Sequence, residues 1–159
     1  MDYSSCLEKA EQQYLIAEHL LKITYPLVQD PKLLLGIADN LLKSLESILD
    51  AWLTYEKQQR LISDYPLQLL PKLAFFRLKL THRNNINPDY LQLLGKLQEL
   101  LDWHQSSSVE FQRNKKLVIC NQGYRLKVIS ASDFPHYLTE TKAFLDFSQK
   151  SLAKLNRKE

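Results

Sequence analysis

Apolar residues recur every three or four positions along most of this chain, a spacing that is typical of amphipathic helices. The pattern predicts five helices, over residues 5–25, 31–59, 66–82, 88–105 and 132–156. The second of these carries the widest apolar stripe, so we expect it to be the central, most buried helix.

Proline and capping residues indicate where these helices begin and end. Pro26 is expected to end the first helix, because proline has no backbone N–H to donate. Asp30, Asp64 and Asn87 precede the second, third and fourth helices, and each side chain is predicted to cap a helix N-terminus.

Between the last two helices the apolar period changes to two, which is typical of strands. Residues 116–129 therefore predict one β-hairpin, with Gly123 supplying the left-handed conformation of its turn. Because side chains alternate between the faces of a strand, Leu126 and Val128 are expected to pack on the helices. Arg125 and Lys127 are then expected to face solvent.

The composition favours one mainly α-helical domain over residues 1–159, an up-and-down bundle of about five helices with the hairpin inserted before the last. The chain is 45% hydrophobic and 25% charged and contains only 3 glycines. Two of these, Gly36 and Gly95, fall inside predicted helices, where close helix contact or an open ligand groove would explain them. Cys6 and Cys120 are expected to be structural thiols.

Two further features bear on where the protein works. The chain has no apolar run of the roughly 20 residues that a membrane span requires. Its N-terminus is acidic and amphipathic, unlike a signal peptide. We therefore expect a soluble cytoplasmic protein without a membrane partner.

The positive charge is concentrated in two stretches of the chain. Residues 65–88 and 111–132 contain nine Lys and Arg residues and no Asp or Glu, whereas the chain as a whole is only +3. Such sorting indicates an anionic partner, such as RNA, DNA, a phosphate ligand or an acidic protein. The first hypothesis is a non-enzymatic binding protein whose third helix and hairpin form one continuous cationic surface that engages RNA or another polyanion.

The candidate contacts of that surface are cationic residues of both stretches together with one aromatic residue. They are Lys72, Lys79, Arg83, Arg113, Lys115, Lys116, Tyr124, Arg125 and Lys127. Phe111 lies among the second group and would stack on bases or pack. Two plainer explanations remain open: a solvated helix face, and lysines that protect an edge strand from aggregation. A third hypothesis is an adaptor that binds an acidic protein.

Arg77 and His82 are candidate catalytic residues. A His is a general acid or base near neutral pH, and an Arg binds phosphate in a bidentate manner. Their separation matches the Arg-x4–6-His pattern of the HEPN ribonucleases, although Leu78 stands where that family usually has a polar residue. The second hypothesis is therefore a metal-independent, toxin-like ribonuclease. The four histidines show no metal-ligand spacing, and no cofactor motif is present.

A broader resemblance supports a helical bundle. The long helical hairpin AEQQYLIAEHLLKITYPLVQDPKLLLGIADNLLKSLESILDAWL resembles the HEPN superfamily, and the whole chain resembles a group of uncharacterised small archaeal proteins. The segment VEFQRNKKLVICNQGYRLKVIS is the most specific part of the second likeness. The resemblance implies a bundle that is often a homodimer, and a link to RNA or to toxin–antitoxin pairs.

Overall fold

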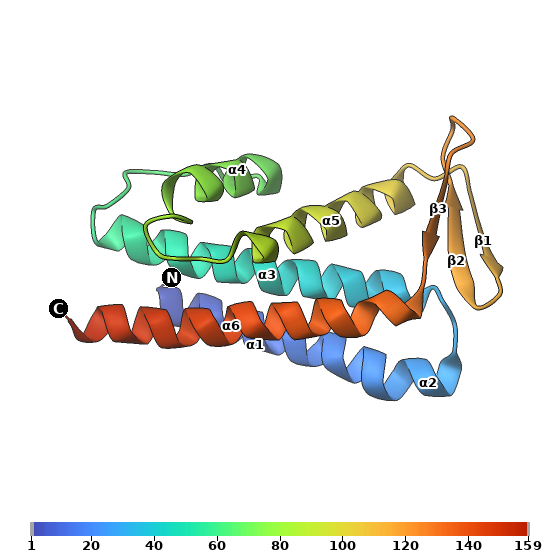
Figure 1. The fold of residues 1–159 in the computed structure, drawn as a ribbon, viewed down its shortest axis with the longest axis horizontal. Coiled ribbons are helices and arrows are strands. Elements are labelled where there is room, and N and C mark those ends of the chain that lie inside the picture. The colour runs from blue at the N-terminus through green and yellow to red at the C-terminus, as the bar shows by residue number, and fades with distance from the viewer. Residues whose placement is uncertain (1, 159) are drawn as a thin grey trace.

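The computed structural model describes residues 2–158 and confirms the mainly helical class (Figure 1). The helical elements are α1 (Tyr3–His19), the π-helical turn η1 (Leu20–Thr24), α2 (Tyr25–Val28), α3 (Leu33–Gln58), α4 (Leu69–Lys79), α5 (Pro88–Gln105), the short 3₁₀ turn η2 (Ala131–Asp133) and α6 (Phe134–Arg157). The strands β1 (Val109–Arg113), β2 (Lys116–Cys120) and β3 (Leu126–Ile129) form an antiparallel sheet between α5 and α6.

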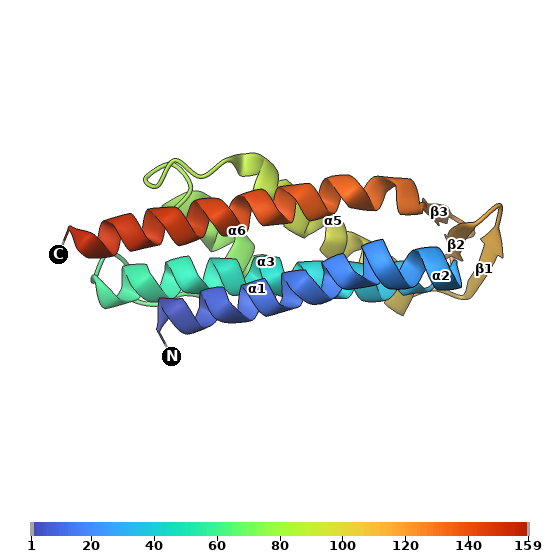
Figure 2. The same ribbon diagram turned by 90° about the horizontal axis from the view of Figure 1, so that it is seen from below.

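The helix α3 lies at the centre of the bundle, as its apolar stripe predicts. It packs against α1, α5 and α6, and most of its side chains are buried. Ser44 Oγ donates to the Ala10 carbonyl of α1 (2.7 Å), and Trp52 Nε1 donates to Ser148 Oγ of α6 (2.8 Å). Viewed from below, α1 and α6 both run alongside α3 (Figure 2).

The prediction that the first helix ends at Pro26 is wrong. Helical structure continues through η1 and α2 to Val28. Proline cannot donate to a carbonyl four residues back, and its ring clashes with that carbonyl. The backbone widens just before it, so that the Tyr25 N–H donates to the Leu20 carbonyl, five residues back. Gln29, in the left-handed conformation (φ 54°), then ends the helix.

Of the three side chains predicted to cap helices, Asn87 does so, Asp30 caps the turn before α3, and Asp64 does not cap α4. Asn87 Oδ1 accepts from the Asp89 N–H and caps α5, as predicted. Asp30 Oδ1 accepts from the Lys32 N–H at the start of the turn that leads into α3. Asp64 does not cap α4, which begins only at Leu69, and it accepts from the Tyr65 N–H instead.

The β-region is a three-stranded meander rather than a single hairpin, because β1 adds a strand that the sequence analysis did not predict. The β1–β2 turn places Asn114 and Lys115 in the left-handed region (φ 52° and 62°). In the β2–β3 loop the left-handed residue is Tyr124 (φ 61°), so the role predicted for Gly123 is wrong. Asn121 Oδ1 organises this loop by accepting from the backbone N–H groups of Gly123 and Arg125.

The orientation predicted for β3 is also wrong. Leu126 and Val128 are 61% and 53% exposed, while Lys127 lies against the bundle with its Nζ 6.0 Å from the centre of the Trp103 ring. The reason is pairing: Ile129 lies opposite Leu117 of β2, and both are buried in the core. Because alternate residues face opposite sides, burying Ile129 turns Leu126 and Val128 outward.

Other expectations concern small residues and membrane spans. Cys6 is buried and Cys120 partly buried, and neither belongs to a disulfide, as expected. Close helix contact does not explain Gly36, because a Cβ there would meet nothing within 4 Å, whereas at Gly95 it would meet Leu73 at 3.9 Å. Among the helices of residues 2–158, none combines the length and apolarity needed to cross a bilayer.

Candidate functional site

The first basic stretch contains a lysine that is not available to a partner. Lys72 is only 4% exposed, and its Nζ lies 2.8 Å from Asp50 Oδ1 and 3.1 Å from Glu46 Oε1 on α3. Burial alone lowers the pKa of Lys72, but the hydrogen bonds and charges of Asp50 and Glu46 outweigh it and raise that pKa. Lys72 therefore has a structural role, because its ion pairs with Asp50 and Glu46 attach α4 to α3.

Arg83 has a similar internal role. Its guanidinium pairs with the Glu56 carboxylate, which is 1% exposed and also accepts from Asn84 Nδ2 (2.8 Å). Since a buried carboxylate without a cation is costly, Arg83 compensates a charge of the core. Arg83 is itself exposed but paired, whereas no described carboxylate forms an ion pair with Arg77 or Lys79, the other two exposed cations of the first stretch.

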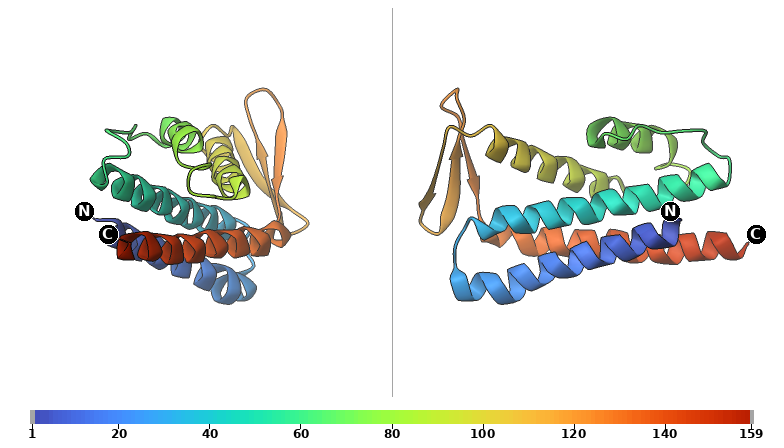
Figure 3. Two further views of the ribbon diagram at one scale, coloured as in Figure 1. Left: turned by 60° about the vertical axis from the view of Figure 1, so that its left-hand side comes forward. Right: turned by 180° about the vertical axis from the view of Figure 1, so that it is seen from behind.

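The two basic stretches do not lie together. The helix α4 lies over the C-terminal half of α3, whereas the sheet lies at the opposite end of the bundle (Figures 1 and 3). The intervening α5 has 18 residues, which corresponds to about 27 Å of helix. The structure thus contains two separate cationic regions in place of one continuous surface.

The sheet covers one end of the bundle and has two unlike faces. Its inner face contributes Leu117, Ile119 and Ile129 to the core. Its outer face, which we define by the alternate strand residues, consists of Val109, Phe111, Arg113, Lys116, Val118, Cys120, Leu126 and Val128. Val118 lies between Phe111 and Val128 in the register, and it is 6% exposed although it is outside the main core cluster.

This outer face is apolar at its centre and hollowed. Val109, Phe111, Leu126 and Val128 are each between 41% and 61% exposed. A shallow hollow of about 250 Å³ lies on it and is also lined by Arg113 and Lys116. Exposed apolar side chains gathered in one patch, with polar groups at the rim, are typical of interaction sites.

The charge around this face has one sign. Arg113, Lys115 and Lys116 lie at the β1–β2 end, and Tyr124 and Arg125 lie in the β2–β3 loop at the other end. All five are exposed, and Tyr124 is the most exposed of them at 88%. Within residues 2–158, no carboxylate forms an ion pair with any of these four cations.

The polar side chains of the strands that do have partners face inward. Gln112 Nε2 donates to Asp30 Oδ1 (2.9 Å), and Glu110 accepts from Ser107 Oγ (2.8 Å). Lys127 Nζ lies over Trp103 and 3.9 Å from Glu99 Oε1. These contacts hold the sheet in place, and they leave the outer face without an acidic residue.

Arg77 and His82 lie away from the sheet, near the end of α4. Both are exposed and line one hollow of about 480 Å³ between the end of α4 and the start of α5, together with Thr81 and Asn87. Arg77 Nη2 donates to the Leu91 carbonyl (3.4 Å), which holds the guanidinium toward α5. The two candidate catalytic side chains therefore share one solvent-accessible hollow.

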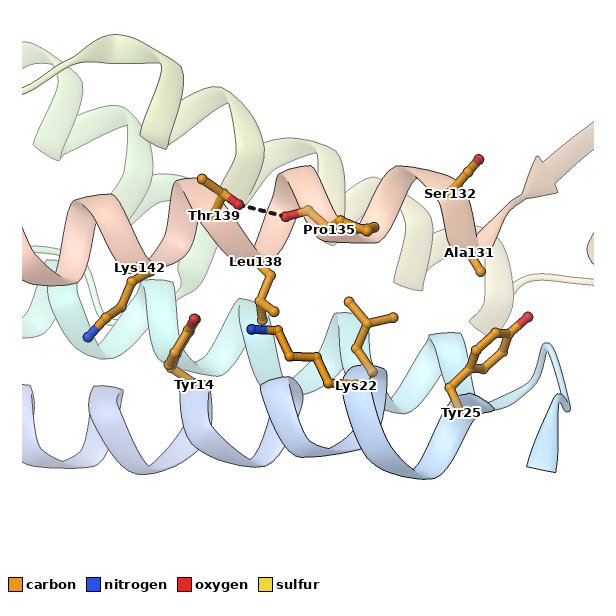
Figure 4. A pocket seen from close by; sticks show the side chains of 10 residues that line it. Tyr14, Lys22, Tyr25, Ala131, Ser132, Pro135, Leu138, Thr139 and Lys142 are labelled. Carbon is orange, nitrogen blue, oxygen red and sulfur yellow. Dashed lines mark hydrogen bonds between the residues drawn. The ribbon is translucent and has the colours of Figure 1, made fainter. Parts of the chain in front are cut away.

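A third hollow, of about 580 Å³, separates α1, η1 and α2 from the start of α6 (Figure 4). Leu21, Tyr25 and Leu138 give it an apolar lining. Its two lysines are already paired: Lys22 with Glu18 (3.3 Å) and Lys142 with Asp146 (3.1 Å). The groove therefore offers apolar surface but no unpaired charge that would select a ligand.

The Cys6 thiol and the Tyr14 hydroxyl are both held in their protonated forms. Burial, followed by the charge of Asp50, raises the pKa of the Cys6 thiol, which opposes formation of the reactive thiolate. Burial, followed by the hydrogen bond to Glu18, raises the pKa of Tyr14 to about 12. Among residues 2–158, His, Cys, Asp and Glu side chains form no cluster of three or more that could hold a metal ion.

The cations at the outer face and Phe111 can be read from the sequence, but the aliphatic part of the face cannot. Val109 belongs to the strand that was not predicted, and Leu126 and Val128 are predicted to pack on the helices. The alternation in VEFQR, followed by Asn114 at a turn position, is the signal that could have revealed β1.

Comparison with protein-family models, curated proteins and solved structures found no match to this chain.

Proposed function

We propose that this chain is a non-enzymatic binding protein whose sheet outer face engages an acidic, partly apolar segment of another protein. The observation that supports this most directly is the combination on one face. Exposed aliphatic side chains lie at its centre, cations surround it, and no acidic residue lies on it.

Each half of that combination has a physical consequence. Burying the exposed side chains of Leu126 and Val128 against apolar groups would contribute about 25 cal/mol for each Å² removed from water. The four unpaired cations would select a negatively charged partner and accelerate its association. A partner with both leucine-like and carboxylate side chains satisfies both requirements.

An RNA partner fits this face less well. Single-stranded RNA is bound mainly through aromatic platforms and phosphate contacts. Phe111 is the single aromatic side chain of the outer face, and Tyr124 lies in the adjoining loop. The aliphatic centre would gain little from phosphates. RNA binding through Arg113, Lys115, Lys116 and Arg125 stays a prediction, and it is a distinct outcome of the same experiment.

The proposal is tested by titrating three labelled probes against the protein. The probes are an amphipathic peptide with leucine and glutamate faces, polyglutamate of equal charge, and oligouridine. The peptide is expected to bind most tightly, since it alone supplies both carboxylates and apolar side chains. Stronger binding of oligouridine would favour RNA, and equal binding of polyglutamate would remove the role of the apolar centre.

A ribonuclease is the second candidate, favoured by the hollow that Arg77 and His82 share. There Arg77 would bind the scissile phosphate while His82 transfers a proton. This candidate predicts RNA cleavage in EDTA that is lost in His82→Ala and kept in His136→Ala, a variant of an exposed histidine on α6. Cleavage that persists in His82→Ala, or no cleavage by the parent protein, would exclude it.

A further inference from the structure

A small hollow of about 150 Å³ lies beside β3, between this strand, α5 and the start of α6. The strand leads directly through η2 into α6, which brings the two elements together (Figure 1). Leu100, Ile129 and Phe134 form part of the wall and belong to the core. The polar part of the lining consists of Lys96, Lys127, Asp133 and Tyr137.

The two lysines of this lining carry charge that is not neutralised at close range. Within residues 2–158, no carboxylate forms an ion pair with Lys96, whose Nζ lies 5.4 Å from the centre of the Tyr137 ring. Lys127 Nζ lies 3.9 Å from Glu99 Oε1, which is too long for a hydrogen bond. Both ammonium groups therefore keep N–H donors for a ligand.

Tyr137 adds a hydroxyl group without a partner. The residue is only 7% exposed, yet its hydroxyl forms no hydrogen bond with any residue that the structure describes. Among these residues, every fully buried side-chain oxygen or nitrogen has a partner, so the Tyr137 hydroxyl must reach open space. The hollow that Tyr137 lines supplies this space, and there the phenol is able to donate to an oxyanion.

The start of α6 acts in the same direction as the lysines. This helix has 24 residues, and its N-cap residue Asp133 forms no side-chain cap hydrogen bond. Phe134, the first residue of the helix, lines the hollow, so the positive end of the helix dipole lies beside it. Helix N-termini favour anions, and together with two lysines this one favours an anionic ligand.

Asp133 narrows the choice of anion. It is the acidic residue among the described residues of the lining, and it forms no ion pair with them. Its carboxylate repels an oxyanion without a proton but accepts a hydrogen bond from one that keeps a proton. Phosphate is able to keep such a proton, because its second pKa is about 6, whereas sulfate has none at neutral pH. The volume equals that of roughly five water molecules, which suits a group of a few atoms.

We infer that this hollow binds a hydrogen phosphate group, either as inorganic phosphate or as the phosphate of a small monoester. Lys96, Lys127 and the Tyr137 hydroxyl donate to its oxygens. Its own P–OH group donates to the Asp133 carboxylate. The site is separate from the sheet outer face, because Lys127 points to the opposite side of β3, toward the bundle.

Isothermal titration calorimetry of the full chain in a phosphate-free buffer tests the inference, with inorganic phosphate, phosphoserine and sulfate as probes. Phosphate is expected to bind about tenfold more tightly than sulfate, and Asp133→Asn should remove most of this difference. Lys96→Gln is expected to weaken phosphate binding by about tenfold, because it removes a charged donor. Tyr137→Phe should weaken it by about threefold, because it removes only a neutral hydroxyl. Tighter binding of phosphoserine than of phosphate would support a monoester as the source, and the reverse would support inorganic phosphate.

Lys150→Gln is the matched control, because Lys150 is an exposed lysine of α6 that does not line the hollow. It should leave phosphate binding unchanged, and circular dichroism should show that every variant keeps its helices. A second measurement needs no variant: phosphate should shift the backbone amide signals of residues 127–137 in the NMR spectrum of the parent protein. No binding of phosphate or phosphoserine, equal affinity of the parent protein for phosphate and sulfate, equal weakening by Lys150→Gln, or shifted signals confined to other residues would each overturn the inference.

Discussion

Lys72 Nζ on α4 lies 2.8 Å from Asp50 Oδ1 on α3, in a position where the lysine is almost completely buried. This contact converts a residue that charge counting assigns to a binding surface into one that stabilises the fold. It also explains how α4 is held, because α4 makes few contacts with the rest of the bundle.

The Lys72 pair predicts a stability effect. Lys72→Met should lower the free energy of unfolding by about 2 kcal/mol, since Asp50 and Glu46 would lose their shared cation. Lys79→Met, which removes an exposed lysine seven residues later, should change it by less than about 0.5 kcal/mol. Urea denaturation measures both values, and equal effects would show that Lys72 has no structural role.

Tyr14 predicts a loss of stability at alkaline pH. Its pKa is raised to about 12 by burial and by the hydrogen bond to Glu18, and its ordinary value is 10.0. The neutral phenol is therefore favoured in the folded state, and its contribution is fully present below pH 10 and disappears as the pH rises toward 12. The raised pKa of Lys72 acts in the same direction above its ordinary value of 10.5.

Thermal denaturation between pH 8 and 12 measures this dependence. Tyr14→Phe should lower stability near pH 8 because the bond to Glu18 is lost, and it should make the alkaline decline shallower. Tyr124→Phe is the control, because the Tyr124 side chain is exposed. An unchanged alkaline slope in Tyr14→Phe would contradict the assignment.

The orientation of the sheet predicts opposite responses on its two faces. Ile119→Ala on the inner face should cost about 2–4 kcal/mol, because it leaves a cavity in the core. Val128→Ser on the outer face should cost less than about 1 kcal/mol, because that side chain is already half exposed. If Val128→Ser were the more damaging change, β3 would face the other way.

Much of the helical framework could be predicted from local signals. The stripe of α3 identified the central helix, and Asn87 followed by Pro88 marked the start of α5, because a cap and its first turn are neighbours in sequence. The π-turn before Pro26 was missed because the usual effect of proline is to end a helix, and here the backbone adapts around it.

The candidate site was less predictable, because tertiary contacts decide which charges are free. Nothing near Lys72 in sequence shows that Glu46 and Asp50, one turn apart on another helix, will meet its ammonium group. Which face of β3 is buried depends on the register in which it pairs with β2. A shift of that register by one residue would bury Val128 and expose Ile129. Charge sorting located the second basic stretch, but only the fold shows that its cations surround an apolar patch.

The sheet outer face is proposed to bind an acidic and partly apolar protein segment. The most direct measurement is the fluorescence anisotropy of the labelled leucine–glutamate peptide, titrated with parent protein and variants at about 50 and 200 mM salt. Two variants change the face: Val128→Ser at its apolar centre and the double variant Arg113→Gln with Lys116→Gln at its rim. Lys79→Gln, on α4, is the control.

Both face variants are expected to weaken binding of the peptide by about fivefold or more, and Lys79→Gln is expected to leave it unchanged. The affinity of the charge variant should depend less on salt than that of the parent protein, because two of the four cations are removed, whereas Val128→Ser removes no cation and should leave the salt dependence unchanged. Absence of binding at the lower salt concentration, tighter binding of oligouridine, or equal weakening by Lys79→Gln would show that the sheet outer face does not bind such a segment.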